Sequence, residues 1–186
     1  MKYLSERVSV DSAPGRTSIV ISARLSKGKE TLLVTWFVAW VLCGAYIIVE
    51  VAGLPPGDLR QYLLVFLAFW TYFLLRIGRS VAWRTKGFEL LRVRNGVFTI
   101  KNSLFGYGKA RDFFIANIER LGPLNIDERS WIWQLNESFW VMGGDRLGFE
   151  HMGDKVAFGK GLTEEEATRV LQVLKKSFAA ERKAEQ

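Results

Sequence analysis

The chain has very few of the residues that most often carry chemistry. Its 186 residues include one cysteine, Cys43, and one histidine, His151. This composition leaves no partner for an intramolecular disulfide and no multi-cysteine metal site within the chain. A cysteine–histidine catalytic pair would have to join an apolar segment to a residue about a hundred positions further along, so nucleophilic catalysis of this kind is disfavoured. We therefore expect no catalytic residue, no metal and no cofactor, and a protein that is not an enzyme.

Charge is almost absent from two long apolar runs. Residues 32–54 contain one charged residue, Glu50, and residues 59–75 contain one, Arg60. Only the tetrapeptide Pro-Pro-Gly-Asp separates the two runs. A helix needs about 20 apolar residues to cross the hydrocarbon core of a bilayer, and the first run satisfies this by itself.

The second run reaches that length when its helix continues past Arg76 and Arg79 to Trp83, because the two guanidinium groups can extend to the lipid headgroups. The sequence therefore predicts a two-helix transmembrane hairpin over residues 31–84. The alternative interpretation is a pair of core helices in a soluble protein. A cleavable signal peptide is disfavoured, since the first run begins well inside the chain and lacks a small-residue cleavage site.

Lysine and arginine are distributed asymmetrically about the two runs. Six basic and three acidic residues precede the first run, whereas the connection has only Arg60, matched by Asp58. Several basic residues follow the second run closely. By the positive-inside rule, both termini are expected in the cytoplasm and the connecting turn on the opposite side of the membrane.

The excess positive charge lies beside the second run. Residues 76–120 hold ten basic and three acidic residues, whereas residues 121–186 hold nine basic and eleven acidic ones. Each basic residue near an anionic leaflet gains roughly 1 kcal/mol, which predicts contact with the bilayer and its anionic headgroups. Nucleic acid is a disfavoured partner, because no recognisable binding motif is present. The residues expected at the membrane surface, here called the basic collar, are Arg76, Arg79, Arg84, Lys86, Arg92 and Arg94.

Residues 1–30 are expected to form a cytoplasmic N-terminal segment with one strand. Between residues 17 and 25, apolar side chains alternate with others, which is typical of a strand with one buried face: Ile19, Ile21, Ala23 and Leu25. A lone strand is not stable in water, so this one must pair with the C-terminal domain or lie against the membrane. The expected position of both termini on one side favours pairing.

Short apolar segments separated by turn signals begin near residue 86. The dipeptide Asn95-Gly96 between two of them is the strongest local signal for a β-hairpin. Gly106 and Gly108 mark a further turn. About seven strands are expected, over residues 88–93, 97–101, 110–115, 118–121, 139–142, 146–151 and 155–158.

One amphipathic helix is expected to follow these strands. Thr163 and Glu166 form a capping box at its start. Apolar residues then recur at helical spacing and form one stripe that needs a sheet to cover: Ala167, Val170, Leu171, Leu174 and Phe178. Residues 181–186 contain no large apolar side chain and are expected to be a disordered tail.

Antiparallel strands followed by one C-terminal helix are the element order of a pleckstrin-homology-like (PH-like) domain. The predicted fold class is a membrane α-hairpin plus an α+β soluble domain. In this domain, residues 85–180, a PH-like antiparallel β-barrel or sandwich of about seven strands is capped by the C-terminal helix.

Two sequence segments carry a resemblance to known proteins. They read GFELLRVRNGVFTIKNSLFGYGKARDFFIANIERL and DRLGFEHMGDKVAFGKGLTEEEATRVLQVLKK. With the strand before the first apolar run, they resemble the bacterial two-span membrane proteins that carry a C-terminal PH-like domain, most of which have no assigned activity. The resemblance implies a multi-pass protein of the bacterial cytoplasmic (inner) membrane. In layout alone, the chain is also similar to photosystem I assembly factors, which supports an assembly role only as an analogy.

Three tryptophans are the strongest candidates for contact with a partner. Trp131, Trp133 and Trp140 lie in the most irregular part of the predicted domain, where they either pack in its core or contact a partner or the membrane. The segment Phe158-Gly159-Lys160-Gly161 lacks the spacing of a phosphate-binding loop and is interpreted as a strand-to-helix turn.

Four acidic residues keep a second interpretation open. Asp127, Glu128 and Glu137 are either solvated loop residues or a paired-carboxylate site. Glu50 lies inside an apolar run, where an ionisable group is a candidate for function, although its nearness to the turn favours a place among the headgroups.

Two functions follow from these observations. The first is a non-enzymatic membrane protein whose cytoplasmic domain is a binding, assembly or regulatory module for another membrane protein or for anionic lipid. A membrane-protein partner or homo-oligomer, and strand addition to a sheet edge, belong to this hypothesis. The alternative is a small subunit of a membrane transporter or enzyme complex that uses Glu50 or the loop acids. Two spans are too few to enclose a pore in a monomer, so the alternative requires an assembly.

Overall fold

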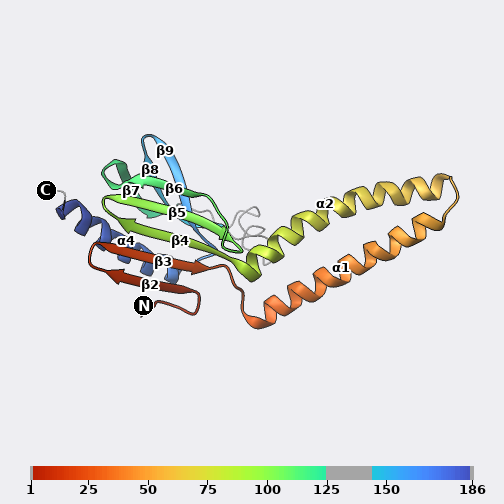
Figure 1. Cartoon of the computed structure of the whole chain (residues 1–186), viewed down its shortest axis with the longest axis horizontal. Helices are drawn as coiled ribbons and strands as arrows, with labels where there is room; N and C mark the ends of the chain where they lie inside the picture. Colours follow the sequence, from red (N-terminus) through yellow and green to blue (C-terminus); the bar gives the residue numbers. More distant parts are fainter. Residues whose placement is uncertain (1, 125–143, 185–186) are drawn as a thin grey trace.

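The computed structural model describes residues 2–124 and 144–184. Two long helices, α1 (Lys27–Gly53) and α2 (Asp58–Lys86), project together from a domain of sheets covered by a third helix, α4 (Glu164–Ala184) (Figure 1). The predicted hairpin and C-terminal helix are therefore both present, and the helices are longer than the apolar runs that predicted them.

The described strands form two antiparallel sheets. One has six strands in the order β1-β2-β3-β4-β5-β6, and the other has three in the order β7-β8-β9. A short 3₁₀ helix, Ile115–Asn117, carries the chain from β6 to β7. The strands are β1 (Lys2–Tyr3), β2 (Val8–Ala13), β3 (Arg16–Ser22), β4 (Gly87–Arg94), β5 (Val97–Leu104), β6 (Ala110–Phe114), β7 (Ile118–Pro123), β8 (Asp145–His151) and β9 (Asp154–Lys160).

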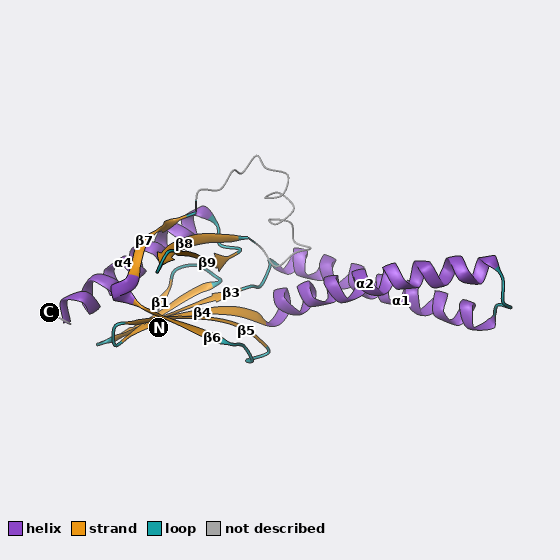
Figure 2. Ribbon diagram, turned by 90° about the horizontal axis from the view of Figure 1, so that it is seen from above, coloured by secondary structure: helices purple, strands orange, loops and turns teal. Residues whose placement is uncertain are grey.

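The sheets differ from the predicted architecture in two respects. Six of the roughly seven strands expected after residue 86 are described, and the N-terminal segment has three strands rather than one, because β1 and β2 were not expected and add an edge to the larger sheet. The two sheets share no strand pairing among the described residues, so the structure shows two sheets and a helix rather than one closed barrel (Figure 2). The strand expected at residues 139–142 lies outside the described residues.

The hairpin is inserted between two neighbouring strands of the larger sheet. β3 pairs with β4 along its whole length, from Arg16 opposite Arg94 to Ser22 opposite Phe88. The chain thus leaves the sheet after β3, passes through α1 and α2, and re-enters it as the adjacent strand. This confirms the predicted pairing of the N-terminal strand and joins residues before and after the hairpin in one domain.

The core lies between the two sheets and α4. Phe98 is fully buried and makes edge-to-face contacts with Phe149, Phe158 and Phe178, so one ring of β5 joins both sheets and the helix. The expected stripe of α4 faces this core, because Ala167, Val170, Leu174 and Phe178 are buried and Leu171 is partly buried against them. The amphipathic pattern therefore predicted the buried face of the helix correctly.

Each long helix is apolar enough to cross a membrane. At 1.5 Å per residue, helices of 27 and 29 residues span about 40 and 43 Å, which exceeds a hydrocarbon core of about 30 Å. Within their most apolar windows, only 11% and 6% of residues are buried. Core helices of a soluble protein would be mostly covered, so the alternative of core helices does not fit this arrangement.

A glycine notch holds the two helices together. Trp70 of α2 is buried against Gly44 of α1, and a Cβ at residue 44 would overlap the indole ring. The same indole donates a hydrogen bond from Nε1 to the carbonyl oxygen of Trp40 at 3.2 Å. Nearer the domain, Phe37 lies against Gly78. These contacts fix which residues of the two helices lie at the same level.

Candidate functional site

The structure separates the basic collar into three groups. Arg76, Arg79 and Lys86 are not buried on α2, as expected for residues near headgroups. Arg84 is only 4% exposed and lies inside the junction between α2 and the domain. The sequence could not distinguish these cases, because burial of Arg84 depends on residues distant in the chain. Its Nη1 comes within 3.3 Å of where a Cβ on Gly161 would stand.

Arg92 and Arg94 are exposed but lie away from the hairpin. β4 begins at Gly87, directly after α2, and rises by about 3.3 Å per residue. The two arginines therefore stand about 17 and 23 Å along the strand from that junction. Their nearness to α2 in sequence does not carry over into space, and contact of the collar residues with lipid stays a prediction.

The other predicted site residues are widely separated. Glu50 is exposed near the far end of α1, where it is a hydrogen-bond partner of Tyr46 one turn earlier. Its exposure shows that a single hairpin does not enclose it. The candidate tryptophans and loop acids lie outside the described residues: Trp131, Trp133, Trp140, Asp127, Glu128 and Glu137.

A buried carboxylate, which the sequence did not single out, lies beside the base of the hairpin. Glu89 of β4 is 1% exposed, and its Oε2 accepts hydrogen bonds from the backbone N–H groups of Gly159 at 2.8 Å and Lys160 at 3.1 Å. Burial raises the pKa of Glu89 to about 7, although these two hydrogen bonds oppose the shift. The alternation of β4 placed Glu89 on the buried face with Leu91 and Val93, which was the available signal.

Other charged groups surround Glu89 from the smaller sheet. Asp145 of β8 raises the pKa of Glu89, and Lys160 of β9 lowers it. Burial also raises the pKa of Asp145, against the charges of Lys160 and Arg111. The Nζ of Lys160 stands 6.0 Å from the ring centre of Trp83 at the end of α2. This cluster joins the base of the hairpin to both sheets.

The chemistry of this cluster is limited by its donors. Among residues 2–124 and 144–184, no group of three or more histidine, cysteine, aspartate or glutamate side chains could hold a metal ion. The Glu89 carboxylate is almost fully buried, and its hydrogen bonds come from backbone N–H groups at the end of β9. These contacts describe a latch between β4 and β9.

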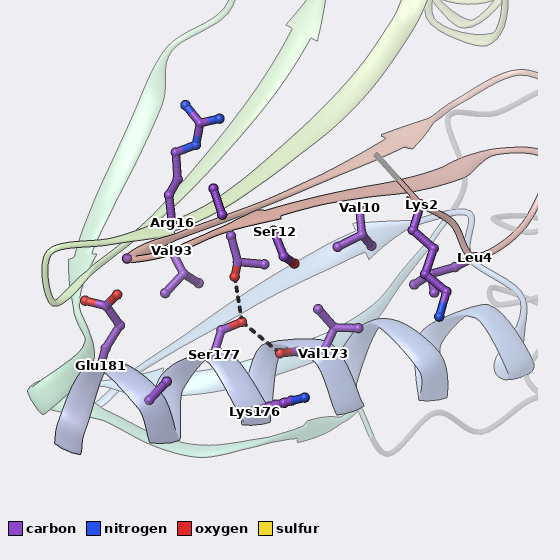
Figure 3. Close-up of a pocket in the computed structure, with 14 residues that line it drawn as sticks. Lys2, Leu4, Val10, Ser12, Arg16, Val93, Val173, Lys176, Ser177 and Glu181 are labelled. Atoms are coloured by element: carbon purple, nitrogen blue, oxygen red, sulfur yellow. Dashed lines mark hydrogen bonds between the residues drawn. The ribbon is translucent and has the colours of Figure 1, made fainter. Parts of the chain in front are cut away.

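A groove runs between α4 and the β2–β3 side of the larger sheet (Figure 3). Its volume is about 550 Å³. Val10, Val93 and Val173 give the groove apolar walls. The hydroxyl of Ser177 also lines it and donates a hydrogen bond to Thr17 Oγ1 or to the Val173 carbonyl oxygen, each at 3.0 Å. Small side chains leave this space open where the helix crosses the sheet.

The rim of the groove carries more positive than negative charge. Lys2 lies on its strand side and Lys176 on its helix side (Figure 3). Arg16 also lines it, although its guanidinium pairs with Asp11 at 3.1 Å. The one acidic residue among the described residues that line the groove, Glu181, accepts a hydrogen bond at 2.7 Å from the Gly96 N–H, which lies in the turn between β4 and β5.

One edge of the sheet beside this groove is incompletely covered. β1 pairs only with Ser9 and Val10, so no described strand pairs with the outer edge of β2 at Ser12 and Ala13. β1 and β2 were not predicted from the sequence, and the groove was therefore not predicted either. The alternation of Val8 and Val10 before the turn Pro14-Gly15 was the signal that could have revealed this hairpin.

Comparisons with family models, curated proteins and solved structures found no match. The functional conclusion therefore depends on the chain's own geometry.

Proposed function

We propose that this chain is a non-enzymatic membrane protein whose hairpin anchors a cytoplasmic binding and assembly module. The observation that supports this function most directly is the groove between α4 and β2. It combines an apolar floor, a basic rim and a partly unpaired strand edge in one place among the described residues. A strand edge with apolar space beside it is how a sheet domain takes up an extended peptide, and a basic rim selects acidic side chains.

The proposed occupant is an extended segment of another membrane protein that carries acidic and apolar residues. Main-chain hydrogen bonds to the edge of β2 would hold it in register, and alternate apolar side chains would enter the groove. The charges of Lys2 and Lys176 favour acidic side chains at the rim. Both lysines are exposed, so this attraction contributes more to encounter and selection than to affinity.

The finer description of the fold and location belongs to the same proposal. A PH-like relationship is supported by the element order, antiparallel strands followed by one helix, and the pairing of β3 with β4 requires both strands on one side of a membrane. With the basic residues before and after the hairpin, this favours a bacterial cytoplasmic membrane with both termini inside.

Two adjacent alanines of α4 provide a sharp test. Ala180 lines the groove, whereas Ala179 is likewise exposed but lines a depression beside β7. A photo-crosslinking amino acid is placed at each position in the full chain in its native membrane, and the attached peptide is identified by mass spectrometry. We expect an adduct with an acidic, apolar segment of one other protein from position 180 and not from 179.

Charge reversal supplies the matched control. Lys176→Glu should abolish most of the adduct at position 180, while Lys175→Glu on the neighbouring face should leave it intact. An adduct with a second copy of the chain, equal adducts at both alanines, or no dependence on Lys176 would contradict the proposal.

A further inference from the structure

The turn between β5 and β6 exposes two aromatic side chains close together in sequence. Phe105 is 61% exposed and Tyr107 is 84% exposed. Gly106 separates them. Neither ring contributes to the core of the domain, and the turn lies outside the groove and the latch described above. This apolar tip therefore has no role in the functions considered so far.

The tip has a fixed shape. Leu104 and Tyr107 exchange backbone hydrogen bonds of 2.8 and 3.0 Å, and the Ser103 hydroxyl donates to the Tyr107 carbonyl at 3.3 Å. Phe105 adopts a φ of 53°, in the left-handed region that few non-glycine residues occupy. A side chain at Gly108 would collide with the Asn102 carbonyl, which holds this part of the turn against β5. The backbone thus presents both rings before anything binds.

The tip lies beside the base of the hairpin. Leu104 is paired with Gly87, the residue that directly follows α2. Figures 1 and 2 both place the end of β5 next to the point where α2 enters the sheet. The contact of Phe37 with Gly78 sets the start of α1 level with the end of α2, so the turn stands near the level of Leu32, where the first apolar run begins, and of Trp83, where the expected second span ends.

Positive charge flanks the aromatic tip. Lys109 is exposed immediately after it, Lys101 precedes it on β5, and Lys86 ends the neighbouring helix. Arg111 is exposed on β6. Aromatic rings with adjacent basic groups are typical of segments that enter the headgroup region of an anionic bilayer.

We propose that the β5–β6 turn is a second membrane contact, in which Phe105 and Tyr107 enter the headgroup region and Lys101 and Lys109 face anionic lipid. The bilayer is the occupant because the hairpin already holds this face toward it, so insertion requires no separate docking step. The contact would fix the tilt of the domain and the direction in which the groove opens. This inference rests on insertion of the hairpin, which belongs to the proposed function.

The single native cysteine makes a direct test possible. Cys43 is exposed in the middle of α1, so an environment-sensitive fluorophore attached there reports whether the hairpin is in lipid. In a Cys43→Ser background, the same fluorophore is attached at Tyr107→Cys or at Met152→Cys. Met152 is the matched control, since it is 80% exposed in the β8–β9 turn. The Asp145–Lys160 pair beside the latch lies at one end of β8, and this turn lies at the other end. Each full-length protein is reconstituted in phosphatidylcholine vesicles with or without phosphatidylglycerol.

Nitroxide groups on the lipids then locate each fluorophore. We expect headgroup nitroxides to quench position 107 and its emission to shift to the blue, more strongly with phosphatidylglycerol, while position 152 stays unquenched. The variant Lys101→Glu/Lys109→Glu should remove the dependence on phosphatidylglycerol. Position 107 behaving like position 152, while acyl-chain nitroxides quench Cys43, would overturn this inference alone. Failure to quench Cys43 would instead overturn the proposed anchor and this inference together.

Discussion

The hairpin and the sheet domain use apolar residues for opposite purposes. In α1 and α2 few large apolar side chains are buried, and a few contacts around Gly44, Trp70 and Trp40 hold the helices together. In the domain, apolar side chains from both sheets and α4 surround Phe98 and are withdrawn from solvent. Apolar side chains therefore form the outer surface of the hairpin, whereas in the domain they form the interior.

This difference separates the two sources of stability. A domain with a packed core loses stability when atoms are removed from that core. A hairpin whose outer surface matches lipid depends on close approach of its helices, for which small residues matter most. Mutations should consequently affect one region without the other, and the following experiments test this independence.

Removing the central aromatic ring should have the largest effect. Phe98→Ala deletes a fully buried side chain that three other phenylalanine rings contact, so we expect a loss of about 3–5 kcal/mol in the stability of the domain. Limited proteolysis of the full chain in vesicles should then cleave the sheet domain while the labelled Cys43 remains in lipid. Loss of both signals together would show that the two regions are not independent.

The buried Glu89 should make domain stability depend on pH. Below pH 4.5, its ordinary pKa, folded and unfolded states both hold the proton, and the favourable contribution is complete. Between pH 4.5 and about 7 the unfolded state loses the proton first, so stability should fall with rising pH by about 3 kcal/mol in total, and then level off.

Glu89→Gln keeps an oxygen acceptor for Gly159 and Lys160 but removes the charge. Denaturant unfolding in mild detergent at several pH values should show a flatter profile for this variant and higher stability than the original chain above pH 7. Glu150→Gln changes a carboxylate of β8 that pairs with Arg120 instead, and serves as the control: it should leave the dependence of stability on pH unchanged. An unchanged slope in the Glu89→Gln variant would show that Glu89 is not its source.

Filling the glycine notch should affect the hairpin and spare the domain. Gly44→Ala places a methyl group against the Trp70 ring, and overpacking of this kind costs about 1–3 kcal/mol. The matched change Gly53→Ala meets no atom within 4 Å. Only the first should separate the helices, which crosslinking between cysteines placed on α1 and α2 would detect. Equal crosslinking in both variants would argue against the notch.

The smallest expected effect concerns the start of α4. Glu166 donates its backbone N–H to Thr163 Oγ1 at 3.2 Å, and its Oε2 accepts from the Thr163 N–H at 3.0 Å. Burial alone would raise the pKa of Glu166, but the hydrogen bonds from Thr163 and Ser5 and the charge of Arg7 lower it. Thr163→Ala should cost about 1 kcal/mol. Thermal unfolding measures it, and Thr168→Ala within the helix provides a comparison.

Local patterns predicted the elements that depend on neighbours in sequence. The capping box of Thr163 and Glu166 is present as expected, and the Asn95-Gly96 turn has the positive φ angles of 51° and 71° that its residues favour. The hairpin and the stripe of α4 followed from composition and periodicity. Each of these features is encoded within a few turns of chain.

The features that could not be predicted from the sequence depend on residues far apart. Burial of Arg84 and Glu89 arises where α2, β4 and β9 meet, and the displacement of Arg92 and Arg94 from the base of the hairpin arises from the direction of β4. Spacing along the chain carried no information about either. The groove required recognition of β2, whose short alternation beside polar residues gives a weak signal.

Insertion of the hairpin between β3 and β4 also has a consequence for biogenesis. β3 is synthesised before both helices, and its partner β4 only after them. If the hairpin is the membrane anchor proposed above, the N-terminal strands must wait until the chain has crossed the membrane and returned. A chain with one inserted helix would leave the two strands on opposite sides, where the sheet cannot close. In that proposed anchor, completion of the sheet is coupled to correct insertion, and a protease on the side of the membrane that holds the domain would distinguish finished from misinserted molecules.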